Sequence, residues 1–182
     1  MTRVRLDLFD SSLNFERGAS TPKFICWYLL KSFFFLSSIP YPSKLKTFIL
    51  RCFGAKIGIG FVLKPRVNIH FPWKLAIGDH VWIGEEALLL NFEMLTIQSN
   101  VCISQRAFLC GGNHDYTIPS MPYRNGKITL REGSWVGASA FIGPNVTIGI
   151  NTVVAATSVV SKSLPDNGIY SGNPACFIKN RW

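Results

Sequence analysis

The chain contains three histidines, and their spacing limits the chemistry they could perform. His70, His80 and His114 lie ten and thirty-four residues apart. A zinc enzyme needs several protein ligands, with histidines at close metal-ligand spacing. No such spacing occurs here, so we expect no metal site.

His114 is the residue most suited to catalysis. An imidazole has a pKa near neutrality, so it can take a proton from a hydroxyl group without special burial. Asn113 and Asp115 on either side are ordinary turn residues, which by themselves fit a surface loop. Asp115 could orient the ring, although adjacent side chains usually diverge. The place of His114 in the fold must therefore decide between a loop histidine and a general base.

Cys110, four residues before His114, raises the alternative of an acyl-cysteine intermediate. Apart from the histidine, nothing in the local sequence would lower the pKa of its thiol, and cysteine is often a small apolar filler. The chain has five cysteines and no CxxC pair. This odd, scattered set favours neither a disulfide framework nor a zinc site, and we expect a reducing, cytoplasmic location.

A six-residue repeat of aliphatic side chains runs through most of the chain. An α-helix cannot use this period, because about 3.6 residues per turn would scatter the positions around its axis. A short strand followed by a turn can use it, since each hexad then forms one flat side of a coil. The repeat positions are Ile57, Leu63, Ile69, Ile77, Ile83, Leu89, Ile97, Ile103, Leu109, Leu130, Val136, Ile142, Ile148, Val154 and Val160.

Extra residues enter this repeat only after every third hexad. The step of six lengthens to eight at two places and to twenty-one between Leu109 and Leu130. If three hexads close one triangular coil, every insertion leaves from the same corner. We therefore predict an all-β solenoid, a parallel β-helix of about five coils and roughly 24 Å in length.

The predicted organisation has two parts. Residues 1–56 do not fit the repeat and form a basic, aromatic-rich helical segment, broken at Pro40 and Pro42, that covers an end of the solenoid. Residues 57–182 form the β-helix. Within it, residues 115–127 project as an arm and residues 164–182 form a C-terminal loop and tail.

The basic charge is concentrated in the first segment. Residues 1–56 carry nine basic and three acidic side chains, a net charge of +6, whereas the rest of the chain carries ten and seven, a net charge of +3. Its apolar run, Phe24 to Ile39, has sixteen residues, and about twenty are needed to span a bilayer. Charge alone would also fit nucleic acid, but no recognition motif is present.

Two interpretations of this segment stay open. Its aromatic residues could cap the first coil, in particular Trp27, Phe33, Phe34 and Phe35. Alternatively, the segment could lie peripherally on the anionic inner face of a membrane, with its cations meeting lipid headgroups.

Several motifs resemble those of one family. The hexads, GNHDY at 112–116 and SGNPA at 171–175 resemble the hexapeptide-repeat O-acetyltransferases, which have a left-handed parallel β-helix. Pro72–Trp73 and TIQSNVCIS at 96–104 are most similar to the colanic-acid-biosynthesis branch. The resemblance covers about residues 50–180. It implies an acetyl-CoA-dependent enzyme without a metal, a homotrimer with its active sites between subunits, and His114 as the catalytic histidine.

The resemblance also implies where acetyl-CoA binds. The pantetheine arm needs exposed backbone amides along a groove, and the phosphates need nearby cations. Trp135 lies at the edge of that groove and could pack on pantetheine. Thr157 and Cys176 depart from the family pattern, which commonly has glycine and a basic residue at these positions. The other positions that match the family's donor groove are Ala138, Ala156, Ser161, Lys162, Pro174 and Lys179.

The acceptor side is expected on the arm and at the corner one coil earlier. Long structureless loops in compact domains are usually functional, and the arm contains Asp115, Tyr116, Tyr123 and Arg124. The tyrosines could stack on sugar rings and the arginine could meet an anionic group; alternatively, the arm packs on a neighbouring subunit. Asn91 should lie about 5 Å from the base of the arm, where its amide could hold an acceptor hydroxyl or simply serve a turn.

These expectations define two functions. The first is transfer of an acetyl group from acetyl-CoA to a sugar hydroxyl of a polysaccharide or its precursor, with His114 as general base. The alternative is a catalytically inactive β-helix, a binding or assembly module that docks at the membrane or on glycan-synthesis enzymes. The intact His114 loop and the SGNPA segment favour the enzyme, because a scaffold would not need them.

Overall fold

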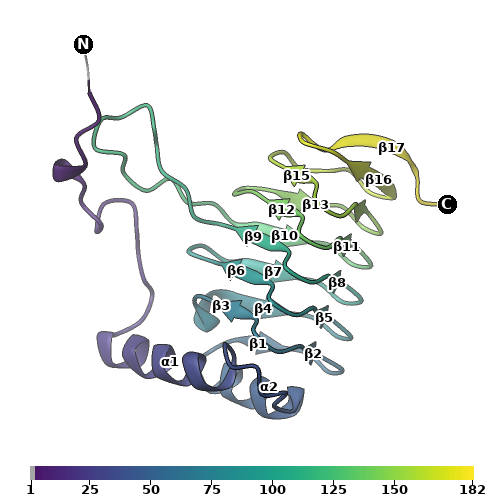
Figure 1. The fold of residues 1–182 in the computed structure, drawn as a ribbon, viewed down its shortest axis with the longest axis horizontal. Helices are drawn as coiled ribbons and strands as arrows, with labels where there is room; N and C mark the ends of the chain where they lie inside the picture. The colour runs from purple at the N-terminus through teal and green to yellow at the C-terminus, as the bar shows by residue number, and fades with distance from the viewer. Residues whose placement is uncertain (1–2) are drawn as a thin grey trace.

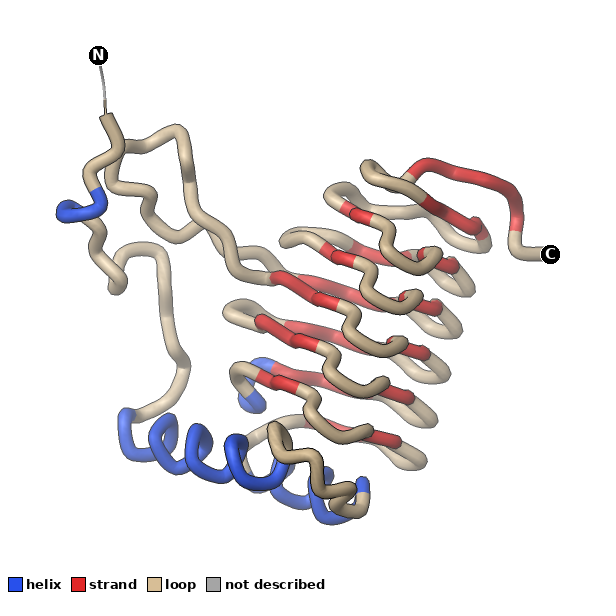
Figure 2. The backbone as a smooth tube through the Cα atoms, in the orientation of Figure 1, coloured by secondary structure: helices blue, strands red, loops and turns tan. Residues whose placement is uncertain are grey.

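The computed structural model describes residues 3–182, which form a triangular prism of parallel strands with two helices across one end (Figure 1). Each turn of the coil contributes one short strand to each of three sheets, and loops join the strands at three corners (Figure 2). We call these corners 1, 2 and 3: corner 1 joins sheet 1 to sheet 2, corner 2 joins sheet 2 to sheet 3, and corner 3 returns from sheet 3 to sheet 1.

The sheets contain the following strands. Sheet 1 consists of β1 (Lys56–Ile57), β4 (Leu75–Ile77), β7 (Leu95–Ile97), β10 (Ile128–Leu130) and β13 (Thr147–Ile148). Sheet 2 consists of β2 (Val62–Leu63), β5 (Trp82–Ile83), β8 (Cys102–Ile103), β11 (Trp135–Val136), β14 (Val153–Val154), β16 (Gly168–Ser171) and β17 (Cys176–Asn180). Sheet 3 consists of β3 (Asn68–Ile69), β6 (Leu88–Leu90), β9 (Phe108–Cys110), β12 (Phe141–Ile142) and β15 (Val159–Val160).

The repeat positions stack as predicted. Ile77, for example, pairs with Ile57 on one side and with Ile97 on the other, and all three side chains are buried. The hexad therefore places one aliphatic residue per face inside the prism and the next residues in a turn. All three insertions leave from corner 3, which confirms the prediction from the spacing.

The predicted count of five coils is one partial coil too low. Leu164 forms a parallel bridge with Ile148, and Tyr170 of β16 pairs with Val154 of β14, so a sixth turn begins within the predicted tail. The step from Val160 to Leu164 is four rather than six, because this passage of corner 3 is shorter than the others. A search for a six-residue period therefore ends one turn early. β17 then pairs antiparallel with β16 and closes this end.

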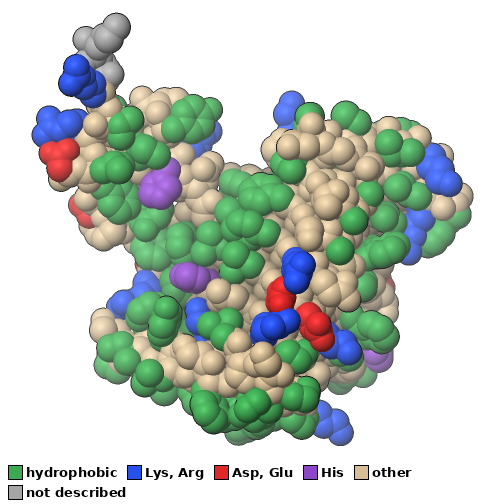
Figure 3. Space-filling model, viewed as in Figure 1, with side chains coloured by type: hydrophobic (Ala, Val, Ile, Leu, Met, Phe, Trp, Pro, Cys, Tyr) green, Lys and Arg blue, Asp and Glu red, His purple; other side chains and the backbone are tan. Residues whose placement is uncertain are grey.

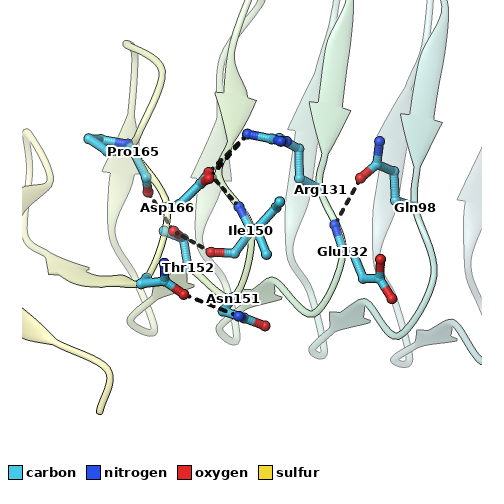
Figure 4. Close-up of polar contacts among 9 residues, drawn as sticks. Gln98, Arg131, Glu132, Ile150, Asn151, Thr152, Pro165 and Asp166 are labelled. Atoms are coloured by element: carbon cyan, nitrogen blue, oxygen red, sulfur yellow. Dashed lines mark hydrogen bonds and ion pairs between the residues drawn. The ribbon is translucent and has the colours of Figure 1, made fainter.

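Polar ladders join successive coils at corner 1 (Figure 4). The side-chain oxygen of Gln98 accepts a 3.0 Å hydrogen bond from the backbone N–H of Glu132. Asp166 accepts from the backbone N–H of Ile150 at 2.8 Å and from the guanidinium of Arg131 at 3.0 Å. These contacts attach the partial sixth turn to the two coils before it.

The helices cover the first coil, as expected. Helix α1 (Thr21–Phe34) follows an extended Ser20 and has a proline in its first turn, and α2 (Ser43–Cys52) follows Pro42. The indole N–H of Trp27 donates to the carbonyl of His70 at 2.9 Å, and the buried ammonium of Lys46 lies 3.2 Å from the carbonyl of Lys64. Two short 3₁₀ turns, η1 (Leu6–Leu8) and η2 (Pro72–Lys74), complete the helical elements. Within residues 3–182, neither α-helix combines the length and apolar character needed to cross a membrane.

The capping interpretation holds for only part of the aromatic run. Trp27 and Phe35 are fully buried in the core, Phe34 packs against it, and Phe33 is 60% exposed. The residues before α1 also differ from the expectation for the first segment. They leave the helices and run along the prism to the arm, where the N–H of Arg5 donates to the carbonyl of Pro119 at 2.8 Å (Figure 1).

Candidate active site

The arm is a hairpin that leaves the body at corner 3 between β9 and β10. Its two stems are antiparallel: the N–H of Asp115 donates to the carbonyl of Pro122, and the N–H of Arg124 donates to the carbonyl of Asn113, both at 2.8 Å. His114 and Tyr123 form a β-bridge between these stems. His114 therefore stands on a paired, ordered stem at the base of a projecting loop.

One hydrogen bond fixes the state of the His114 ring. Nδ1 lies 2.6 Å from the backbone carbonyl of Met121. Because a carbonyl only accepts, Nδ1 carries the proton and donates it, and in the neutral ring Nε2 is left with a free lone pair. This is the tautomer that a general base acting through Nε2 requires.

Two aromatic rings, which also contact each other, pack against the imidazole. The Tyr123 ring lies 4.9 Å from the His114 ring, centroid to centroid, and the Phe9 ring lies 5.5 Å from it. Phe15 packs on Tyr123 at 5.1 Å and on Phe92 at 5.2 Å. The first residues of the chain thus contribute two rings to the wall beside His114.

The other arm residues that we expected to contact the acceptor differ in their exposure and in their hydrogen bonds. Tyr116 is 78% exposed at the tip, and Arg124 is exposed on the return stem. The Asp115 carboxylate accepts hydrogen bonds from the hydroxyl and the N–H of Thr117, and the hydroxyl contact lowers the pKa of this carboxyl. Asp115 thus shapes the tip of the hairpin, and the Met121 carbonyl orients His114 in its place.

Asn91 lies at corner 3 one coil before the arm, since Leu90 pairs with Cys110. It is 2% exposed, and its amide N–H groups donate to the carbonyls of Phe71 at 2.7 Å and Lys74 at 3.1 Å. Its side-chain oxygen accepts from the Phe71 N–H at 3.0 Å. The amide thus closes the 71–74 turn. Contact with an acceptor stays a prediction and would require that turn to open.

Cys110 is poorly placed as a nucleophile. Its sulfur lies 3.2 Å from the carbonyl of Gly112, and burial raises the pKa of its thiol. A raised pKa keeps the thiol protonated near neutrality, and the protonated thiol is a weak nucleophile. The geometry therefore favours direct transfer over an acyl-cysteine route.

Most of the predicted donor residues gather along sheet 2 and corner 2. Trp135 lies on β11, is 45% exposed, and donates its indole N–H to the hydroxyl of Ser104 at 2.9 Å. Ala138 follows at corner 2, with its carbonyl bonded to the N–H of Thr157 on the next coil. Ala156 and Pro174 occupy the same corner on later turns, and Lys179 lies on β17.

The other two donor residues lie across sheet 3. Ser161 and Lys162 are exposed and follow β15 at corner 3. This is the corner that carries His114, two coils further on, or about 10 Å along the prism. Within one chain, therefore, His114 shares a corner with Ser161 and Lys162, whereas the Trp135–Ala138–Ala156 group lies at a different edge.

Corner 2 fits a ligand that needs backbone groups at the surface. The Cα of Gly137 packs so closely on the next coil that an added Cβ would lie 2.5 Å from the N of Ala156. Small residues follow at 138 and 156, and Trp135 supplies an exposed ring nearby. These residues are compatible with an extended pantetheine-like chain along the edge. Among residues 3–182, no three His, Cys, Asp or Glu side chains are grouped so that they could hold a metal ion.

The sequence reasoning missed three residues of the site. The Met121 carbonyl that orients His114 is a backbone group, so the residue type at position 121 gives no indication of its role. Phe9 and Phe15 reach the arm by a contact between distant parts of the chain. No repeat or motif places these two residues there, so no signal in the sequence could have found them.

Comparison with known proteins agrees with this architecture. No model of a known protein family matches the sequence. The chain is 39% identical over 165 residues to the Escherichia coli protein named "Putative colanic acid biosynthesis acetyltransferase WcaF", covering 91% of each chain. It is also 28% identical over 130 residues to galactoside O-acetyltransferase of Escherichia coli, covering 69% of this chain and 63% of that one.

Solved structures show the same fold. A hexapeptide-repeat acetyltransferase from Vibrio cholerae, complexed with acetyl-CoA, superposes with a TM-score of 0.80 at 22% identity, over 90% of this chain and 91% of that one. These neighbours are left-handed β-helices, which agrees with the predicted hand. With its stacked hexads, its corner-3 arm and a 39% identical relative covering nine-tenths of its length, the chain belongs to the hexapeptide-repeat acetyltransferases, in the colanic-acid-biosynthesis branch.

Proposed function

We propose that this acetyltransferase transfers the acetyl group of acetyl-CoA to a hydroxyl of a sugar in a polysaccharide or its precursor, with His114 as general base. The observation that carries the proposal is the 2.6 Å hydrogen bond from Nδ1 of His114 to the Met121 carbonyl. It leaves Nε2 free, at the base of an arm whose exposed Tyr116 and Arg124 could contact a glycan.

In this mechanism Nε2 of His114 removes the proton of the acceptor hydroxyl as its oxygen attacks the thioester carbonyl. The imidazolium then returns that proton to the departing thiolate, so the histidine ends neutral. The Met121 carbonyl stabilises the imidazolium because its dipole points at Nδ1–H throughout. Backbone N–H groups at the donor edge would stabilise the oxyanion.

The donor identity rests on the relatives and on corner 2. Acetyl-CoA or CoA is bound in several of the similar solved structures, among them the Vibrio cholerae enzyme and a galactoside acetyltransferase. In this chain, Trp135 and the alanines at 138 and 156 offer an exposed ring and open backbone along one edge, and Lys162 and Lys179 offer cations for the phosphates.

We further propose that the site is completed in a homotrimer. His114 and the Trp135–Ala138–Ala156 group lie at different corners of one prism, so a second copy is needed to bring a donor edge to a histidine. Four of the outward side chains of sheet 3 between these corners, from β6 to β15, are apolar, namely Leu88, Phe108, Phe141 and Val159; on β3 the equivalent residue is Asn68. Heterologous threefold packing would cover such a face. Light scattering at micromolar concentration should give a trimer; a fully active monomer would contradict it.

Acetyl transfer can be tested with His114→Ala. Wild-type protein is assayed with acetyl-CoA against capsule-type oligosaccharides and nucleotide sugars, with thiol release and the mass of the product as readouts. We expect His114→Ala to keep its fold and assembly and to lose at least about 10²-fold in turnover. Turnover near the wild-type value would refute the role of His114. If the wild type acetylates none of these acceptors, the assembly-module alternative is favoured.

A further inference from the structure

Helix α1 is apolar on both of its sides. Trp27 and Phe35 point into the core, and Phe34 packs against it. The opposite side also carries large apolar residues, at positions 25, 28, 29, 33 and 36, which recur at helical spacing. An apolar helix of this kind normally has both sides covered. Here one side faces away from the prism and is covered by no other part of residues 3–182.

The neighbouring elements extend this surface. Phe48 on α2 is 66% exposed, as is Ile59 in the first coil. Helix α2 packs on β1 and β2 through its buried residues Lys46, Ile49 and Leu50, so its exposed side also points away from the prism. We name this surface the base face; its members, 37–67% exposed, are Ile25, Tyr28, Leu29, Phe33, Leu36, Ile39, Leu45, Phe48 and Ile59. Figure 3 shows hydrophobic side chains gathered over the helices at this end.

The charge around the base face is mostly positive; the exception is Asp79, whose carboxylate accepts a 2.8 Å hydrogen bond from the backbone N–H of Ile59. Between Glu16 and Asp79 the sequence contains ten lysines and arginines and no acidic residue. Lys44, Arg51 and Lys56 are exposed among them. Beside α2, a hollow of about 370 Å³ is lined by Lys44 and Arg51 together with Phe48 and Ile59. Cations and apolar side chains thus line one depression at the end of the molecule.

We propose that the base face docks this protein on the surface of an anionic lipid bilayer. Apolar side chains would enter the boundary between headgroups and acyl chains while the surrounding cations meet lipid phosphates. A second copy of the chain is disfavoured as the occupant, because two base faces would bring uncompensated positive charge together. A bilayer satisfies both features at once, and α1 needs only to lie on it, since the helix is too short to span it.

The position of the face agrees with this role. It covers the end of the prism formed by the first coil, whereas the arm leaves from a side corner two coils away (Figure 1). Docking by this end would therefore leave the candidate active site open to an acceptor.

Co-sedimentation of the full-length protein with vesicles tests the proposal. One set of vesicles contains phosphatidylglycerol and phosphatidylcholine in equal parts, and the other contains phosphatidylcholine alone. We expect pelleting with the anionic vesicles at low salt and release at high salt, because the electrostatic attraction is screened. Protein that stays in the supernatant with anionic vesicles at low salt would overturn the proposal.

Two variants separate the apolar and the electrostatic contributions. Leu29→Ser/Phe33→Ser/Phe48→Ser should lower partitioning into anionic vesicles at least about tenfold. Lys44→Gln/Lys56→Gln should lower it by about thirtyfold, at roughly five- to sixfold for each cation. The matched control is Ile178→Ser/Trp182→Ser, which removes exposed apolar side chains at the opposite end and should bind as the wild type does.

Light scattering and acetyl transfer to a soluble acceptor complete the test. The apolar variant should keep wild-type mass and activity, which shows that any loss of vesicle binding is not a loss of fold. If that variant instead changes the oligomeric mass and binds vesicles as well as the wild type, a second copy covers the base face and the proposal is wrong. The outcome for the His114 mechanism is independent of these results.

Discussion

A half-buried histidine should make this protein sensitive to acid. His70 follows β3 at corner 3, and its ring lies between those of Phe71 and Phe92, with centroids 4.9 and 5.0 Å away. Burial, and secondarily the positive charge of Lys31, lowers the pKa of His70 from 6.5 to about 4. Protonating this ring in the folded protein is therefore costly, whereas the unfolded chain accepts the proton readily.

The direction and size of the effect follow from this difference. Between pH 6.5 and about 4 the unfolded state binds more protons at this site than the folded state does, so the free energy of unfolding falls as the pH falls through this window. Above about pH 6.5 the group contributes no pH dependence. A gap of about 2.5 between the two pKa values corresponds to about 3 kcal/mol of unfolding free energy at pH 4 as an upper bound. Because the ring is only half-buried, solvent screening reduces the expected loss to about 1–2 kcal/mol.

His70→Gln tests this reasoning, because glutamine is polar but does not titrate. Urea unfolding is followed at fixed protein concentration at several pH values from about 7 to about 4. We expect the wild type to lose about 1–2 kcal/mol more than His70→Gln over this range. Lys31→Met should show an intermediate loss, because it removes only the second cause. Parallel pH profiles for the wild type and His70→Gln would refute the assignment.

Three further predictions follow from individual contacts. Cys110→Ala should retain most acetyl-transfer activity, measured as thiol release; complete loss with a trapped acetyl-peptide would support the covalent route instead. Trp27→Ala should lower the free energy of unfolding by about 3–5 kcal/mol, whereas Leu29→Ala on the exposed side of the same helix should change it by about 0.5 kcal/mol or less. In thermal unfolding, Gly137→Ala should cost about 1–3 kcal/mol because its Cβ would meet the next coil at 2.5 Å, and Gly143→Ala, where the nearest atom is 3.3 Å away, should cost less.

The body of the fold could be predicted because the number of residues on each side of a β-helix coil sets the period of the aliphatic repeat in the sequence. Each buried column consists of residues one coil apart, such as Ile83 and Ile103, so a fixed step of six reports the three-sided coil. The predicted solenoid ended one turn early because the step from Val160 to Leu164, across corner 3, is four residues, two fewer than the regular step of six. Leu164 and Tyr170 still occupy the columns, but a fixed period cannot find them.

The candidate site was less accessible to this reasoning. The sequence identified His114 through its place on the longest insertion, which the structure places at the base of the arm. The group that orients the ring is a carbonyl on the opposite stem, and its position depends on how the hairpin pairs. For Asn91, the residue type and its corner allowed either a substrate contact or a turn role; in the structure its buried amide bonds to the 71–74 turn, and the substrate contact stays a prediction.

The candidate active site and the base face lie on different parts of the prism surface. The candidate catalytic groups lie at corners 2 and 3, on either side of the apolar sheet 3, so assembly through that side can join a histidine from one copy to a donor edge from another. The base face lies at the end of the prism and uses none of these residues. Docking at a membrane and assembly of the active site would therefore not compete. Substitutions at Phe33 or Phe48 should change where the enzyme acts without changing the chemistry at His114.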